Sequence, residues 1–147
     1  MKNMNNFSDI KVAVALNEIK NNPKGGKKYL DYFNESSGNA YCSEFVSWCA
    51  NEVGLIDAGV IPKYDAAGKA VSWFKQNNQW QNSGYCPSVG DIILFDYDGG
   101  GSDHTGIVVS CDGDKVYTVE GNVGGVNKES SYDINDSDIL GYGVPNY

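Results

Sequence analysis

Residues 41–54 read YCSEFVSWCANEVG, and this stretch has the spacing of an amphipathic helix. The apolar positions that recur on one helical face are Phe45, Val46, Cys49 and Val53. Gly54 is typical of the residue that follows a helix C-terminus. A polar turn over residues 36–39 precedes the start of this stretch. We therefore predict a helix that carries Cys42 in its first turn.

The rest of the chain has mainly helical patterns before Pro87 and strand patterns after it. The other predicted helices are one that Ser8 caps and Pro23 ends, a short one over residues 28–33, and one over residues 66–75. The apolar positions of the first helix are Val12, Ala15, Leu16 and Ile19. Segments rich in Val, Ile, Tyr and Phe predict strands over residues 91–95, 105–111 and 116–119. Helices followed by an antiparallel sheet indicate an α+β fold, and residues 1–147 are expected to form one domain.

The composition is acidic, with 11 Lys and Arg against 19 Asp and Glu and a net charge of -8. Because no basic stripe is present to neutralise phosphates, we expect neither a nucleic-acid partner nor an anionic membrane partner. The apolar runs are far shorter than the roughly 20 residues that cross a bilayer. Residues 1–25 are too polar for a secretory signal. A protein that acts outside the cell would then need another delivery route, or would be an excised domain.

The four cysteines show no metal-binding spacing. They contain no CxxC pair, and His104 is the only histidine, so we expect no zinc site. Cys42 and Cys49 lie about two helical turns apart, which is too far for a disulfide. The sequence leaves open whether Cys86 pairs with Cys111.

Cys42 is the candidate nucleophile. A thiol at a helix start lies near unpaired backbone N–H groups and the positive end of the helix dipole, and both favour the thiolate. The alternative is that Cys42 is a small core residue, which is the commoner role of an arbitrary cysteine.

His104 is the candidate base, and Glu120 and Asn122 are its candidate partners. Glu120 and Asn122 share one face of a strand because side chains alternate. If Cys111 lies opposite Lys115, His104 lies opposite Asn122 and diagonal to Glu120. A two-residue turn at Asp112 and Gly113 would turn both partners away. His104 would take the thiol proton, and Glu120 or Asn122 would orient the ring.

Other residues could contact substrate. The backbone N–H of Cys42, with Tyr41 or Ser43, is the expected set of donors for an oxyanion. Three aromatic residues either line a groove or belong to the core and surface, namely Trp73, Trp80 and Tyr97.

The segments that carry chemistry resemble the CHAP family of cysteine, histidine-dependent amidohydrolases and peptidases. In order they are residues 41–50 with 53–55, residues 90–95, residues 104–108 and residues 120–122. Residues 29–33 and 139–145 are also similar to the flanks of that family. The similarity therefore covers nearly the whole chain.

The resemblance implies a papain-like (NlpC-like) α+β fold, with N-terminal helices packed on an antiparallel sheet. It also implies a hydrolase that cleaves amide bonds of bacterial peptidoglycan with Cys42, His104 and Glu120, and with Asn122 beside them. Such an enzyme is an N-acetylmuramoyl-L-alanine amidase or an endopeptidase of the stem or cross-bridge. Ser43-Glu44 departs from the commoner small residue after the nucleophile.

The same resemblance bears on metals and cofactors. Some members carry an Asp-rich calcium loop before the cysteine, whereas residues 34–41 contain only Glu35 as a carboxylate. We therefore predict no metal and no cofactor.

Two alternatives remain beside the hydrolase. One is a catalytically silent wall-binding module, against which the complete set of Cys42, His104 and Glu120 argues. The other is an antibacterial toxin domain with an inhibitory partner. For the hydrolase we expect a monomer that acts on peptidoglycan in an extracellular or cell-wall location, for example as a phage lysin.

Overall fold

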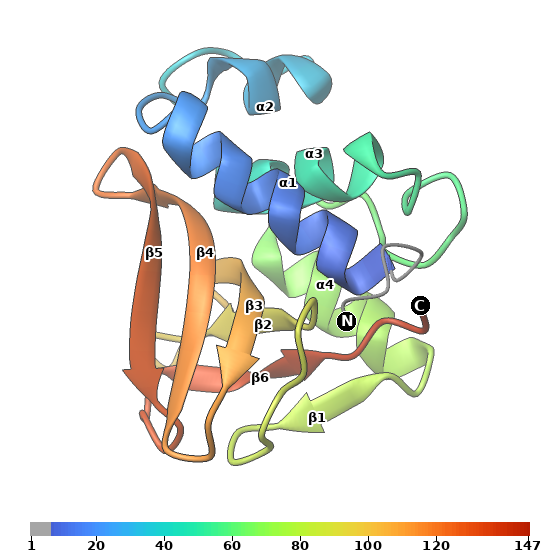
Figure 1. Ribbon diagram of the computed structural model, residues 1–147, viewed down its shortest axis with the longest axis vertical. Helices are drawn as coiled ribbons and strands as arrows, with labels where there is room; N and C mark the ends of the chain where they lie inside the picture. Colours follow the sequence, from blue (N-terminus) through green and yellow to red (C-terminus); the bar gives the residue numbers. More distant parts are fainter. Residues whose placement is uncertain (1–6) are drawn as a thin grey trace.

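The computed structural model describes residues 7–147, in which four helices gather over one side of a sheet (Figure 1). The helices are α1 (Phe7–Asn21), α2 (Lys27–Tyr32), α3 (Cys42–Glu52) and α4 (Ala67–Gln76). They confirm the predicted helical regions to within a few residues. Within the described part of the chain, no helix has the length and apolar character needed to cross a membrane.

The sheet has six strands in the order β1-β6-β2-β3-β4-β5, and all neighbours are antiparallel. The strands are β1 (Trp80–Asn82), β2 (Ile92–Phe95), β3 (His104–Cys111), β4 (Lys115–Val123), β5 (Val126–Asp133) and β6 (Ile139–Gly143). This arrangement confirms the α+β class and the three predicted strands. The sequence patterns missed β1, β5 and β6. β5 reads VNKESSYD at the edge of the sheet, where burial no longer requires apolar residues.

The central strands have apolar residues on both faces. Ile92 and Leu94 belong to the large core cluster that includes the helices, whereas Ile93 and Phe95 belong to a second cluster on the opposite face. All four residues of β2 are buried. Because alternate side chains of a strand point to opposite faces, β2 links the two clusters.

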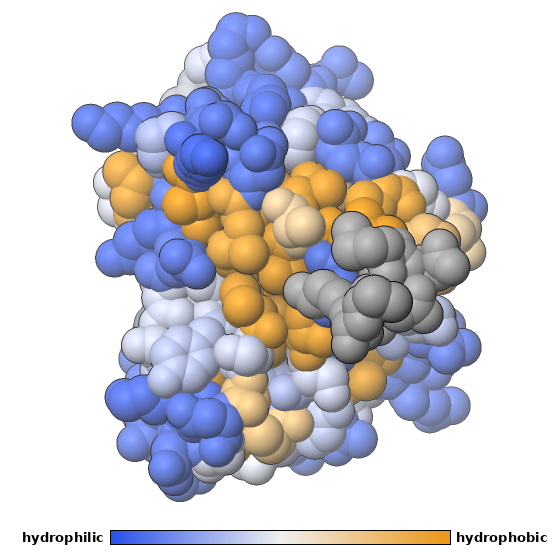
Figure 2. All heavy atoms as spheres, in the orientation of Figure 1, coloured by the Kyte–Doolittle hydropathy of each residue, from blue (hydrophilic) through white to orange (hydrophobic). Residues whose placement is uncertain are grey.

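Helix α1 departs from its predicted orientation. Its buried face includes Lys11 and Glu18, whereas Leu16 and Ile19 are only partly buried. The Nζ of Lys11 donates to the Gly90 carbonyl at 2.8 Å, and Glu18 accepts from the Tyr29 hydroxyl at 2.8 Å. These partners allow two charged residues to face inward. Figure 2 shows apolar surface over and beside α1 on the outward side.

The proposed role of Ser8 as a helix cap is wrong. Ser8 lies inside α1, which already includes Phe7, and its side chain is buried.

The hairpin between β3 and β4 has a different turn from the one predicted. Cys111 pairs with Val116 rather than with Lys115, so the prediction of Cys111 opposite Lys115 is wrong. The register then shifts between Val108 and Ser110, and beyond this bulge Ile107 pairs with Val119. The bulge shifts the pairing of β3 and β4 by one residue, which is the shift that a different turn would otherwise have to provide. The register near the site is therefore the predicted one.

The structure settles the cysteine pairing. Cys86 and Cys111 form a disulfide across 25 residues, while Cys42 and Cys49 are free. This disulfide ties the segment before β2 to the end of β3.

Candidate active site

Cys42 is the first residue of α3. Its neighbour Tyr41 is the N-cap, and the Tyr41 carbonyl accepts the Phe45 N–H at 2.8 Å. Gly38 has a φ of 93°, in the left-handed region, within the turn that leads to the helix. The thiol of Cys42 is therefore held at the positive end of a helix, as the sequence predicted.

His104 and Glu120 meet from neighbouring strands. His104 Nε2 lies 2.8 Å from Glu120 Oε1, and the Glu120 side chain is fully buried. The thiol of Cys42 is hydrogen-bonded to the His104 side chain. Since Nε2 faces Glu120, the sulfur meets the other ring nitrogen, Nδ1. Three side chains from α3, β3 and β4 thus form one hydrogen-bonded row.

The row changes the protonation of the thiol and the imidazole. Burial alone would raise the pKa of Cys42, but the hydrogen bond and the charge of His104 outweigh it and lower the pKa. Burial alone would lower the pKa of His104, but hydrogen bonds to Cys42 and Glu120 raise it to about 9. Both shifts favour a thiolate beside an imidazolium near neutral pH.

Glu120 has two further partners. Its Oε2 accepts the Thr118 hydroxyl at 2.5 Å and the Tyr132 hydroxyl at 2.7 Å. Thr118 could have been found from the sequence because it lies two residues before Glu120 on the same face. Tyr132 could not, because no apolar pattern predicted its strand, β5.

Asn122 lies at the edge of the site rather than on the histidine. Its φ is 63°, and its backbone N–H donates to Asn127 Oδ1 at 3.4 Å. Its backbone also lies against the Tyr41 hydroxyl. Among residues 7–147, His104 has no hydrogen bond to the Asn122 side chain. The structure therefore joins Glu120, and not Asn122, to the ring.

Ser43 and Tyr41 flank the thiol in different ways. The Ser43 hydroxyl is hydrogen-bonded to the sulfur of Cys42. The ring of Tyr41 is buried and stacks on Tyr29 with a centroid separation of 5.7 Å. Ser43 thus contacts the reactive atom directly, while Tyr41 supports the start of the helix.

One of the three candidate groove aromatics lies at the site. Tyr97 is 52% exposed, and its ring stacks beside His104 with a centroid separation of 6.1 Å. Trp73 and Trp80 are partly buried and pack against the large core cluster. Tyr97 is therefore positioned to contact a substrate, whereas the two Trp residues have a packing role.

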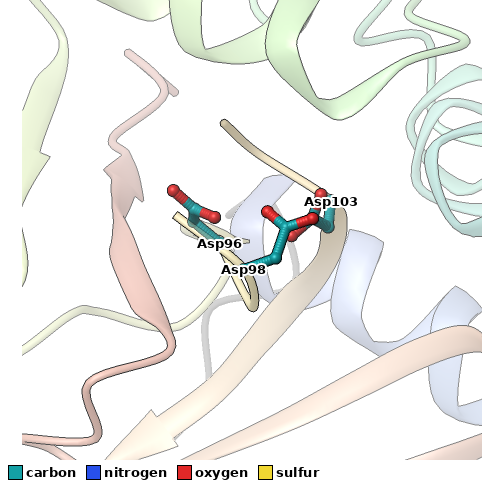
Figure 3. A group of neighbouring side chains, drawn as sticks. All are labelled: Asp96, Asp98 and Asp103. Atoms are coloured by element: carbon teal, nitrogen blue, oxygen red, sulfur yellow. The ribbon is translucent and has the colours of Figure 1, made fainter. Parts of the chain in front are cut away.

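Three carboxylates could hold a cation next to the site. Asp96, Asp98 and Asp103 each offer an oxygen, and these oxygens lie within 4.8 Å of one another in the loop between β2 and β3 (Figure 3). Backbone N–H groups of the same loop already donate to them, for example Gly99 to Asp96 at 2.8 Å.

A second acidic pair lies beside the nucleophile. Glu44 is buried in α3, and burial together with a hydrogen bond to Glu35 raises its pKa to about 8. The Glu44 carboxyl group is therefore largely protonated at neutral pH. Calcium usually takes six to eight oxygen ligands, and this pair supplies few of them.

The fold and the row of Cys42, His104 and Glu120 define an α+β protein with an activated thiol. The chain belongs to the CHAP family, because the CHAP domain model matches residues 32–122. The family predicted from the sequence motifs is thereby confirmed. No curated protein sequence matches the chain.

Two solved structures are similar to the chain. The crystal structure of Ly7917 is 25% identical with a TM-score of 0.57. The crystal structure of Ly7917 with the hydrolyzing product of MDP is 24% identical with a TM-score of 0.53. Each comparison covers 91% of this chain and 62% of the other, so the chain spans less than two thirds of Ly7917.

Proposed function

We propose that this protein is a peptidoglycan hydrolase that cleaves an amide bond with Cys42 as nucleophile and His104 as acid and base. The observation that carries this proposal is the hydrogen-bonded row from Cys42 through His104 to Glu120. A silent wall-binding module would have no need for a thiol with a lowered pKa beside a buried ion pair.

The first half of the reaction follows from this geometry. The Cys42 thiolate attacks the carbonyl carbon of the scissile amide, and the carbonyl oxygen becomes an oxyanion. The Cys42 backbone N–H at the start of α3 is its expected donor. The C–N bond then breaks as the His104 imidazolium gives its proton to the leaving nitrogen. An amine leaves, and the acyl group remains on sulfur as a thioester.

The second half restores the site. Water gives a proton to neutral His104 and attacks the thioester carbon. The C–S bond breaks, the thiolate leaves, and the acyl group departs as a carboxylic acid. Glu120 stabilises the imidazolium that forms in this step, because its carboxylate lies 2.8 Å from the ring nitrogen.

Membership of the CHAP family and the likeness to Ly7917, which was solved with the hydrolyzing product of MDP, support peptidoglycan as the substrate. The exposed ring of Tyr97 beside His104 is a suitable contact for a sugar or peptide.

An extracellular or cell-wall location fits the proposed substrate. The Cys86–Cys111 disulfide supports this location, because disulfides persist mainly in oxidising compartments. We propose that the protein acts there as a monomer with a papain-like catalytic domain.

Mass spectrometry of fragments released from purified peptidoglycan tests the proposal. New amino termini on L-Ala would identify an amidase, and new termini within the stem or cross-bridge would identify an endopeptidase. The Cys42→Ala variant should release neither. A folded wild-type protein that binds peptidoglycan but releases no fragments would instead support the wall-binding module.

A further inference from the structure

The partners of the buried Glu120 carboxylate define a further part of the machinery. Oε1 faces His104 at 2.8 Å, and Oε2 accepts both the Thr118 hydroxyl and the Tyr132 hydroxyl. The Glu120 side chain is fully buried, so these protein donors take the place of solvent. Thus Oε1 holds the His104 ring, and Oε2 is held by the two hydroxyl groups.

We infer that Tyr132 and Thr118 are positioning residues that hold the Glu120 carboxyl group in place and aimed at His104. This inference rests on the proposed function, in which His104 is an imidazolium before the C–N bond breaks and becomes one again when water gives it a proton. Neither hydroxyl touches the thiol or the scissile bond in this scheme. Both act through Glu120.

The sheet register explains why these two residues serve one oxygen. Tyr132 of β5 pairs with Val116 of β4, and Thr118 lies two residues further along β4 on the same face. Tyr132 also packs on Phe95, with ring centroids 4.9 Å apart. The phenol is thus fixed by the edge strand and by the apolar cluster below it.

Electrostatics require such donors. A carboxylate without water is strongly disfavoured unless hydrogen bonds and an opposite charge compensate. Burial, followed by the negative charge of Glu120, raises the pKa of Tyr132, so its hydroxyl keeps its proton and remains a donor. Loss of either donor would let the Glu120 side chain rotate away from the ring. This rotation would weaken its hydrogen bond to His104.

A double-mutant cycle distinguishes positioning from simple packing. Tyr132→Phe and Thr118→Val remove one hydroxyl each and keep most of the side-chain volume. We expect each to lower kcat on fragments of peptidoglycan by about 10- to 100-fold, with KM nearly unchanged, as for a hydrogen bond to a charged group. In a Glu120→Ala background, Tyr132→Phe should change kcat by less than about twofold, because the acceptor is gone.

Tyr142→Phe is the matched control. Tyr142 is fully buried in the same apolar cluster, and its hydroxyl has no hydrogen-bond partner among the described residues. Removal of the Tyr142 hydroxyl should leave kcat unchanged. Equal losses of kcat from Tyr132→Phe in the wild-type and Glu120→Ala backgrounds would overturn the inference, because they would indicate a role in packing alone.

A second readout is independent of activity. His104 is the only histidine, so the NMR signal of its Nε2–H, which faces Glu120, has no overlap from another histidine. We expect this signal to be protected from exchange in the wild-type protein and in Tyr142→Phe, and to broaden or vanish in folded Tyr132→Phe. An unchanged signal would overturn the inference. If the wild-type protein released no fragments, the proposed function would fail while this measurement still tested the network.

Discussion

Gly106 leaves the space that the Glu120 side chain occupies. A β-carbon at position 106 would lie 2.6 Å from Cγ of Glu120 and 3.1 Å from the Val119 carbonyl oxygen. Gly106 does not have a left-handed φ, so space rather than backbone conformation requires glycine there. This contact explains why a glycine stands two residues after His104.

The first prediction concerns Gly106→Ala. The added methyl group should push Glu120 away from His104 and lower turnover by at least about tenfold, since the loss of one charged hydrogen bond has this size. Turnover of peptidoglycan fragments by the folded variant is the measurement. Gly68→Ala is the control, because Gly68 is in α4 and has no atom within 4 Å of an added β-carbon. Normal turnover in Gly106→Ala would show that Glu120 is not needed in its present place.

The second prediction separates the two free cysteines. Cys42→Ser should abolish lysis of cell walls, whereas Cys49→Ser should retain it in the folded fraction. Cys49 is fully buried, and burial raises the pKa of its thiol, so it is no nucleophile. Turbidity of a wall suspension measures lysis, and thermal unfolding measures the expected loss of stability in Cys49→Ser. Full lysis by Cys42→Ser would refute the nucleophile assignment.

The third prediction is a bell-shaped dependence of kcat/KM on pH. The acidic limb reports protonation of Cys42, whose pKa is lowered, and the alkaline limb reports loss of the His104 proton near its pKa of about 9. The negative charge of Glu120 contributes to the raised pKa of His104. Glu120→Gln should therefore move the alkaline limb to lower pH, and a limb that stayed in place would contradict the pairing.

The fourth prediction compares the two candidates for the third member of the site. Glu120→Ala should lower turnover more than Asn122→Ala, because Glu120 is hydrogen-bonded to the ring and Asn122 is not. Both should cost less than His104→Ala. Turnover of the three folded variants on wall fragments gives the ranking. The assignment would fail if Asn122→Ala were the more damaging of the two.

The fifth prediction is that activity persists after chelation of divalent cations. The mechanism uses a thiolate and an imidazolium, and no step requires a metal. Turbidity assays with and without a chelator provide the measurement. If chelation abolished activity and calcium restored it, variants of Asp98 and of Glu44 would locate the ligands in the loop between β2 and β3 or beside α3.

Much of this protein was predictable from local patterns. The helix at residues 42–52, the strands around His104 and Glu120, and the motifs of the CHAP family are short-range features of the chain. Helical and strand periodicity depend on neighbouring residues, so they can be recognised without a structure. The pairing of His104 with Glu120 was expected for the same reason.

Other features depend on contacts between distant segments. The bulge between Val108 and Ser110 sets the register at the site, although the predicted turn was wrong. Lys11 of α1 can be buried because the Gly90 carbonyl, 79 residues away, accepts a hydrogen bond from its Nζ. No local pattern around Lys11 or Gly90 in the sequence predicts this contact.

The sequence by itself determined the α+β class and the family, and it predicted Cys42, His104 and Glu120 as a set. Only the tertiary structure decided that Glu120 rather than Asn122 meets the ring, and that Tyr132 from a polar edge strand supports it. The physical reason is that periodicity indicates which face a side chain takes, whereas a hydrogen bond requires two atoms from different strands to lie within about 3 Å. That distance is set by register, bulges and packing across the whole sheet.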